Sequence, residues 1–202
     1  QIVFLSGKSG MGARAPTDND RYLRAEWEAA GYDRSIIKVR DVSVEHSARK
    51  VEITCRLMIT AVSVQRILDI DAKWFVDPEG EIGCRVVCRR DPQLPMLPRL
   101  GLRLFLPETL ENVEYYGYGP YESYVDKHQA SWLDTFYDNV ERMHEDYIMP
   151  QENGSHWNCE YVKLTDRNGD GILAFASFPF SFNVSRYTQE ELTCKAHNYE
   201  LV

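Results

Sequence analysis

Two glutamates stand in short sequences rich in glycine and proline, where the chain is expected to turn sharply. Glu122 follows a Gly-Pro-Tyr sequence, and Glu152 is the third residue of a Pro-Gln-Glu-Asn-Gly sequence. Glycoside hydrolysis requires a pair of carboxyl groups, one as the acid and the other as nucleophile or base. A carboxylate inside a tight turn can instead accept hydrogen bonds from backbone amides and hold the loop in shape. We interpret Glu122, Glu152 and the adjacent Asn153 as structural residues of two such corners, and we assign no catalytic residue.

A second set of candidates consists of polar side chains next to two expected helices. Asp18, Asn19 and Asp20 crowd into one turn just before the first helix. Capping explains Asp20 by itself, because an N-cap aspartate accepts a hydrogen bond from the first helical turn. His197 follows the second helix and could act as an acid, although a lone histidine there is more often a packing residue. We retain all four as candidates for a position beside a substrate.

Two other sets of residues imitate known sites without completing them. Ser123, Asp126 and His128 have the residue types of a hydrolase triad, but no nucleophile elbow surrounds the serine. Asp166–Gly171 copies the first half of a calcium-binding EF-hand loop, whose twelfth position should be a bidentate glutamate and is Ser177 here. The sequence therefore predicts a hairpin turn at Asp166–Gly171 and no metal site.

Composition and charge bound the class of protein. The 202 residues suffice for one sizeable core, and hydrophobic residues make up 44% of them. A net charge of −8 disfavours nucleic acid or anionic lipid as a partner. No apolar stretch is long enough to span a bilayer, and the five scattered cysteines contain no Cys-x-x-Cys spacing that would indicate a zinc site. We expect a globular protein with no nucleic-acid or membrane partner.

Hydrophobic residues alternate with polar residues along much of the chain, as in antiparallel sheets with one face on a core. The clearest runs lie at 51–61, 68–76, 82–88 and 100–106, and further strands are expected at 36–44, 113–118, 157–165 and 172–178. Short helices are expected at 21–30 and 188–196, the second beginning with a capping box of Thr188 and Glu191. The predicted fold class is therefore all-β with two short helices.

A run of tyrosines between residues 115 and 124 could form a platform for stacking a sugar ring. Alternate positions of a strand point to opposite faces of the sheet, so the rings must divide between two faces. We interpret Tyr116 and Tyr118 as core residues and leave the positions of Tyr121 and Tyr124 open.

Four short sequences occur in a fixed order along the chain: Arg14–Asp20, Tyr116–Asp126, Pro150–Gly154 and Phe182–Tyr187. Together they resemble the C-terminal β-sandwich, or small-chain, domain of the β-galactosidases of glycoside hydrolase family two. The resemblance implies a two-sheet antiparallel supersandwich, similar to galactose mutarotase. Residues 1–13 would be a flexible approach segment and residues 14–202 the sandwich domain. Because the family's domain continues through further strands, we expect this one to be shortened at its C-terminal end.

The resemblance also implies a function for the enzyme to which such a domain belongs. That parent would cleave terminal β-galactosides with two carboxylates on a separate barrel domain. This chain would line one side of the active site and structure the enzyme, and would be inactive alone. Its partners would be the rest of the polypeptide, the β-galactoside reached through the parent, and further copies in a homo-oligomer. The implied cofactors, magnesium and sodium, belong to the parent, and none is expected for this chain.

For residues 130–147, the periodicity of the sequence and the family resemblance predict different structures. Apolar residues from Leu133 to Tyr147 recur at helical spacing, which favours an amphipathic helix over residues 130–147. The family has this stretch mostly extended between two corners. We adopt the extended prediction.

Two functions of other classes stay open. The chain could be a stand-alone carbohydrate-binding module that uses the concave face of a sheet. It could also be a sugar mutarotase, which requires a histidine and a carboxylate facing each other across that face. A carboxylate facing His197 across the sheet would favour the mutarotase alternative.

Overall fold

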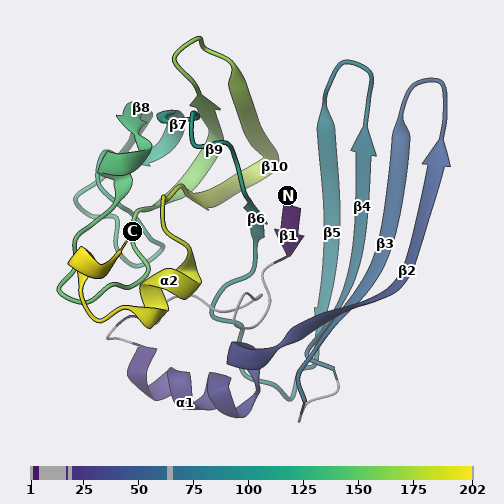
Figure 1. Cartoon of the computed structure of the whole chain (residues 1–202), viewed down its shortest axis with the longest axis horizontal. Coiled ribbons are helices and arrows are strands. Elements are labelled where there is room, and N and C mark those ends of the chain that lie inside the picture. The colour runs from purple at the N-terminus through teal and green to yellow at the C-terminus, as the bar shows by residue number, and fades with distance from the viewer. Residues whose placement is uncertain (1, 5–16, 18–19, 63–65, 202) are drawn as a thin grey trace. The chain divides into compact units, whose positions relative to one another are not determined.

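The computed structural model describes residues 2–4, 17, 20–62 and 66–201 (Figure 1). The chain forms two compact units, which we call the N-terminal unit, Ile2–Arg103, and the C-terminal unit, Leu104–Val202. Each unit contains one four-stranded antiparallel sheet, and the two α-helices of the described residues have 9 and 6 residues. The all-β fold class with two antiparallel sheets is thus confirmed. The supersandwich arrangement stays a prediction.

The sheet of the N-terminal unit has the strand order β2-β3-β4-β5, so each strand pairs with its neighbour in sequence. Its strands are β2 (Ile36–His46), β3 (Val51–Thr60), β4 (Leu68–Val76) and β5 (Ile82–Arg90). The predicted runs of alternation coincide with β3, β4 and β5. A separate two-stranded sheet pairs β1 (Ile2–Phe4) with β6 (Leu102–Leu104), so the run expected at 100–106 is a strand at its central three residues.

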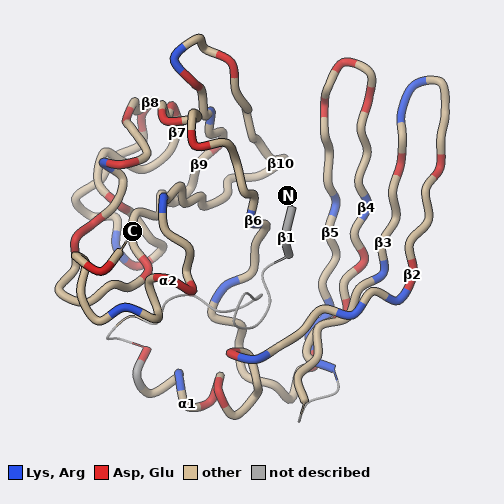
Figure 2. Tube along the Cα trace, viewed as in Figure 1, with Lys and Arg blue, Asp and Glu red and all other residues tan. Residues whose placement is uncertain are grey.

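Alternate side chains of β3 and β4 form the core of the N-terminal unit. Leu57, Ile59 and Ile70 are buried there, and Trp27 of helix α1 (Arg21–Ala29) packs against them. The helix was predicted over residues 21–30 and is confirmed. Charged residues gather at the turns, as Figure 2 shows for the β2–β3 and β4–β5 hairpins. The division of apolar and charged side chains follows the period of two that the sequence displays.

The sheet of the C-terminal unit has the strand order β10-β9-β7-β8. Its elements are β7 (Asn112–Gly119), β8 (Trp132–Asn139), β9 (Ser155–Thr165), β10 (Gly171–Asn183), α2 (Gln189–Cys194) and short 3-10 helices at Val140–Met143 and Asn198–Glu200. Asp166 closes the β9–β10 turn by accepting hydrogen bonds from the amides of Asn168 at 2.8 Å and Asp170 at 3.0 Å. The predicted hairpin turn is therefore confirmed.

The segment 130–147 is mostly extended and contains no α-helix, so helical periodicity would have predicted it wrongly. Strand β8 occupies its first half and pairs with β7 from Trp132 opposite Gly119 to Asn139 opposite Asn112. The apolar spacing continues through the 3-10 helix that follows, where Val140 and Met143 are buried. Pairing along the whole of β7 satisfies backbone groups that a helix here would leave unpaired.

The tyrosines of β7 correct one prediction from the sequence. Tyr115 is the core residue, 1% exposed, and it packs with Val113 and Phe182. Tyr116 and Tyr118 lie on the opposite face of the strand and are half-buried. The error was a shift of one residue in the strand's inward face, which moves every side chain to the other side.

His156 of β9 lies in the same core and is 3% exposed. Its ring packs on Tyr115 with centroids 4.4 Å apart and stacks on Phe182 at 5.3 Å. Nδ1 lies 3.2 Å from the carbonyl oxygen of Tyr118, which fixes the proton on that nitrogen in the neutral ring. Burial lowers the pKa of His156, and the hydrogen bond to Tyr118 and the charges of Asp138 and Glu122 do not offset this effect.

We expect the buried His156 to make the protein less stable at acidic pH. Its folded pKa lies below the value of about 6.5 in the unfolded chain, so the unfolded state binds more protons as the pH falls through this range. Stability should therefore decrease below about pH 6.5. The free energy of unfolding is measured with urea between pH 7.5 and pH 5, at intervals of about one pH unit, and its slope against pH gives the effect.

The matched variants are His156→Phe, which fits the aromatic surroundings, and His46→Gln, which changes an exposed histidine of β2. His156→Phe should flatten the dependence on pH, and His46→Gln should leave it unchanged. An unchanged slope in His156→Phe would show that another group is responsible.

Candidate functional site

The corner after β7 begins at Gly119 and Pro120, which are joined by a cis peptide bond. Ser123 lies at its centre and is fully buried. Its hydroxyl donates to the carbonyl oxygen of Tyr118 at 3.0 Å and accepts from the amide of Trp157 at 2.9 Å, so it joins the end of β7 to β9. Because this hydroxyl is engaged with backbone groups, Ser123 is placed as a structural residue and not as a nucleophile.

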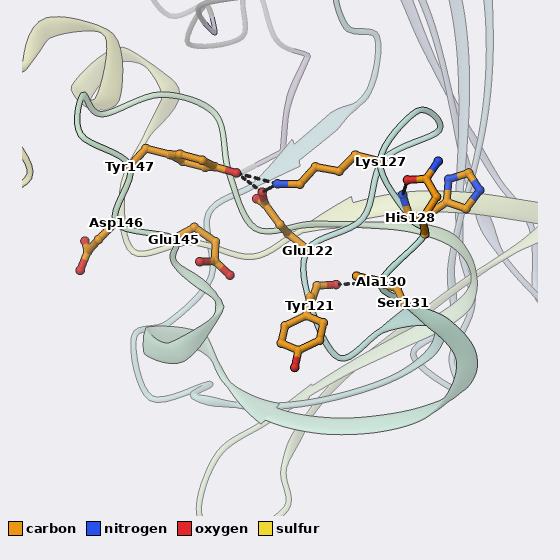
Figure 3. A pocket seen from close by; sticks show the side chains of 10 residues that line it. Tyr121, Glu122, Lys127, His128, Ala130, Ser131, Glu145, Asp146 and Tyr147 are labelled. Atoms are coloured by element: carbon orange, nitrogen blue, oxygen red, sulfur yellow. Dashed lines mark hydrogen bonds and ion pairs between the residues drawn. The ribbon is translucent and has the colours of Figure 1, made fainter.

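Glu122 is 8% exposed, and its carboxylate receives three donors in the C-terminal unit. Oε2 accepts the amide N–H of Gly154 at 2.8 Å. Oε1 accepts the Lys127 ammonium and the Tyr147 hydroxyl, as the dashed lines of Figure 3 show. One buried carboxylate therefore holds together the corner after β7 and the loop before β9.

The charge of Glu122 is stabilised in this position. Burial raises the pKa of its carboxyl group, but the hydrogen bonds from Lys127, Tyr147 and Gly154 more than offset burial and leave the pKa below its ordinary value. For Lys127, burial acts to lower the pKa, and the hydrogen bonds to Glu122 and Tyr147 raise it overall. A carboxylate held ionised by three donors cannot deliver a proton at neutral pH, which argues against a role as general acid.

Asn153 extends the corner toward β10. Its side-chain oxygen accepts the amide of Glu145 at 3.0 Å, its side-chain nitrogen donates to the carbonyl oxygen of Gln151 at 3.0 Å, and its backbone oxygen accepts the side chain of Asn183. Three of the four sequences singled out above, those around residues 116–126, 150–154 and 182–187, therefore meet at one place. These contacts support the structural interpretation of Glu122 and Asn153, which stays a prediction.

Glu152 lies in the same loop and is 7% exposed. A carboxylate inside a tight turn is expected to accept hydrogen bonds from nearby backbone amides, and its removal would then leave those amides without an acceptor. We expect Glu152→Ala to lower the free energy of unfolding by about 1–3 kcal/mol, measured by urea unfolding of the purified chain. Glu160→Ala, on an exposed position of β9, is the control. An unchanged stability in Glu152→Ala would contradict the structural role.

A pocket of about 400 Å³ opens beside this corner (Figure 3). Its walls come from two loops, residues 121–131 and 145–147. Tyr121, which is 60% exposed, and Glu145 stand on opposite loops, and in Figure 3 the side chain of Glu145 points toward the space between Glu122 and Tyr121. The pocket thus combines an aromatic ring with polar groups, and the Glu122 side chain in its lining is held by hydrogen bonds.

The remaining candidates are placed as follows. Asp18 and Asn19 lie outside the described residues. Asp20 occupies the N-cap position of α1 and is 4% exposed, but its side chain accepts no hydrogen bond from the first turn of the helix. It accepts instead the amide and the hydroxyl of Thr17 at 2.9 and 3.0 Å, so the prediction that its carboxylate caps the helix was wrong. His197 is exposed on the C-terminal unit, where its ring stacks on Tyr199 and its Nδ1 lies 3.3 Å from Glu200 Oε1. The next residue, Asn198, donates from its side chain to the backbone oxygen of Tyr147, whereas the described contacts of His197 itself are with Tyr199 and Glu200.

Sequence reasoning missed two residues of the corner, Lys127 and Tyr147. Lys127 had a signal, since it follows Glu122 by five residues in one loop with the opposite charge. Tyr147 had none, because its contact with Glu122 spans 25 residues and depends on how the two loops fold together.

Comparison with known proteins decides which family this is. The family model described as β-galactosidase small chain matches residues 4–202. The chain belongs to this family. The family predicted from the four sequences is therefore confirmed, and the match also includes residues 4–13 of the segment that the sequence predicted to be a flexible approach.

Full-length relatives of the small-chain family are much longer than this chain. A β-galactosidase of Actinobacillus pleuropneumoniae is 44% identical over 188 residues, covering 93% of this chain and 18% of that protein. A β-galactosidase of Staphylococcus xylosus is 34% identical over 196 residues, covering 97% and 20%, and one of Streptococcus thermophilus is 31% identical, covering 93% and 18%. The chain thus spans about a fifth of the length of the curated relatives it matches.

Two further observations concern metals and membranes. Within residues 2–4, 17, 20–62 and 66–201, no group of three or more histidine, cysteine, aspartate or glutamate side chains could hold a metal ion. In the same part of this small-chain family member, no helix has both the length and the apolar character needed to cross a bilayer.

Proposed function

We propose that this chain is a domain of a β-galactosidase that structures the enzyme and lines one side of its active site, without supplying the catalytic carboxylates. The observation that carries the proposal is the small-chain match over residues 4–202 in a chain that spans about a fifth of its relatives. The geometry of the corner supports it, since Glu122 is held ionised among three donors and serves the loops around it.

The proposal gives the other candidates defined roles. Asp18, Asn19 and Asp20 would lie beside the β-galactoside in the parent, and His197 would lie near the same substrate. The partners would be the rest of the β-galactosidase polypeptide and further copies of it in a homo-oligomer. Magnesium and sodium, which the family resemblance implies for the parent, would be bound by the rest of its polypeptide.

The mutarotase alternative gains less support. A mutarotase needs a histidine and a carboxylate that face each other across the concave face of a sheet. The carboxylate beside His197 is Glu200, from the same turn of the chain. We therefore retain the β-galactosidase domain as the function that the residues support best.

A chimera tests the proposal. The segment of the Actinobacillus pleuropneumoniae β-galactosidase that matches this chain is deleted in one protein and replaced by residues 1–202 in another. Deletion should abolish hydrolysis of a chromogenic β-galactoside, and replacement should restore it. In the chimera, Asn19→Ala should raise KM more than it changes kcat, because the loop would contact substrate.

The purified chain alone is the control for this assay, and we expect it to hydrolyse nothing. Turnover by the chain alone that Glu122→Gln or Glu145→Gln abolishes would show a catalytic pair in the pocket and contradict the proposal. A chimera that folds and assembles but stays inactive would contradict it as well.

A further inference from the structure

Hydrogen bonds fix both walls of the pocket beside the Glu122 corner. One wall belongs to the loop that Glu122 and Ser123 fix to β7 and β9, and the other begins at Glu145, whose amide is held by Asn153 at 3.0 Å. Its volume of about 400 Å³ lies in the range of small-molecule sites. Binding there would require little ordering of the loops, which favours affinity for a small ligand.

Tyr121 gives the pocket an aromatic surface. Its side chain is 60% exposed, although its backbone oxygen accepts a hydrogen bond from the Ser131 hydroxyl at 3.4 Å. The residue is therefore held at its backbone and open at its ring. An exposed ring on a fixed loop is suited to packing against a flat ligand with an apolar face.

The polar groups of the pocket include both acceptors and donors of hydrogen bonds. The Glu145 carboxylate points into the space beside Tyr121, and carboxylates accept without donating when ionised. Gln129 and Ser131 line the same pocket and add groups that both donate and accept. Such a set fits a ligand that presents several hydroxyl groups.

The charges of the pocket exclude one class of ligand. Glu122 and Lys127 form an ion pair and neutralise each other, which leaves the negative charges of Glu145 and Asp146 on the lining. A phosphate or another anion would be repelled there. A neutral ligand with hydroxyl groups and one apolar face satisfies both the ring and the acceptors.

We propose that this pocket binds a neutral sugar of the galactoside class, with Tyr121 stacking on the apolar face of the ring and Glu145 accepting its hydroxyl groups. The choice of galactoside rests on the proposed function, whereas the preference for a neutral sugar rests on the pocket. Glu122 does not contact the sugar. Its hydrogen bonds to Gly154 and Tyr147 keep the two loops of the pocket in position.

The test is an NMR titration of the purified 202-residue chain with methyl β-galactopyranoside. We expect shifts of the amides around Tyr121, Gln129 and Glu145, with a Kd of about 1–10 mM. Tyr121→Ala and Glu145→Ala should each weaken binding at least about tenfold, whereas Tyr121→Phe, which keeps the ring, should retain it. The matched controls are Tyr137→Ala, which removes a 71% exposed ring of β8, and Glu141→Ala, which removes an exposed carboxylate.

Three results would overturn the proposal: no shifts in the unmodified chain, equal binding by Tyr121→Ala, or the same shifts with glycerol, which would mean an adventitious additive only. Methyl β-glucopyranoside separates the two parts of the inference. Equal binding of both glycosides would overturn the galactoside class. The chimera assay tests the proposed function independently. An active chimera together with no sugar binding by the chain rejects only the proposal that the pocket binds sugar. An inactive chimera together with such binding rejects only the proposed function.

Discussion

Replacing Gly154 by alanine is expected to lower the free energy of unfolding by about 3 kcal/mol or more. Gly154 has a φ of 67°, a conformation that a side chain disfavours, and a Cβ there would lie 2.2 Å from the backbone oxygen of Met143. Backbone cannot move aside as a flexible side chain can. The shift would also pull the Gly154 amide away from Glu122, so the clash and the lost hydrogen bond act together.

Gly169→Ala is the matched control for this prediction. Gly169 belongs to the same unit and has a φ of 88°, but a Cβ there would meet nothing within 4 Å. Its replacement should cost about 1–2 kcal/mol, from the backbone conformation alone. Both variants are measured by urea unfolding. If Gly154→Ala loses no more stability than Gly169→Ala, the close approach to Met143 does not matter.

The sequence predicts most strands because alternation survives wherever one face of a sheet is buried. Strands β3, β4 and β5 pair only with sequence neighbours, so local pattern and final partner agree. Strand β8 shows the limit. Its apolar residues suit a helix equally well, and its state is decided by pairing with β7, which periodicity does not contain. Tyr115 and Tyr116 show another limit, because five nearby tyrosines give no clue to which face is inward.

The sequence could predict that the two glutamates stabilise corners, but it could not predict which groups they contact. The Gly-Pro and Asn-Gly sequences around Glu122 and Glu152 indicate corners that need acceptors, since turns leave amides unpaired. Which amide Glu122 accepts could not be read from the sequence, because Gly154 lies 32 residues away. The burial of Asn153 also depends on contacts distant in the sequence. Asn153 begins an Asn-Gly-Ser sequence that matches the glycosylation motif, yet it lies inside the corner and is only 5% exposed.

Removing the carboxylate at the centre of this corner is expected to have an effect of similar size. Glu122→Ala should lower the free energy of unfolding at pH 7 by about 3 kcal/mol, the low end for breaking a buried ion pair. The low end applies because Glu122 is buried and Lys127 is 58% exposed, so the lysine can regain water. The amide of Gly154 and the hydroxyl of Tyr147 also lose their acceptor.

The dependence on pH distinguishes the charge of Glu122 from its shape. Its folded pKa is lowered relative to about 4.3 in the unfolded chain, so its contribution is complete above that value and is lost as the pH falls through the folded pKa. Glu122→Gln keeps the shape and should lose this part of the acid dependence. Glu141→Ala, at an exposed position of the same unit, should keep it. A double-mutant cycle with Lys127→Met isolates the ion pair, and a coupling energy near zero would mean that Gly154 and Tyr147 alone hold the corner.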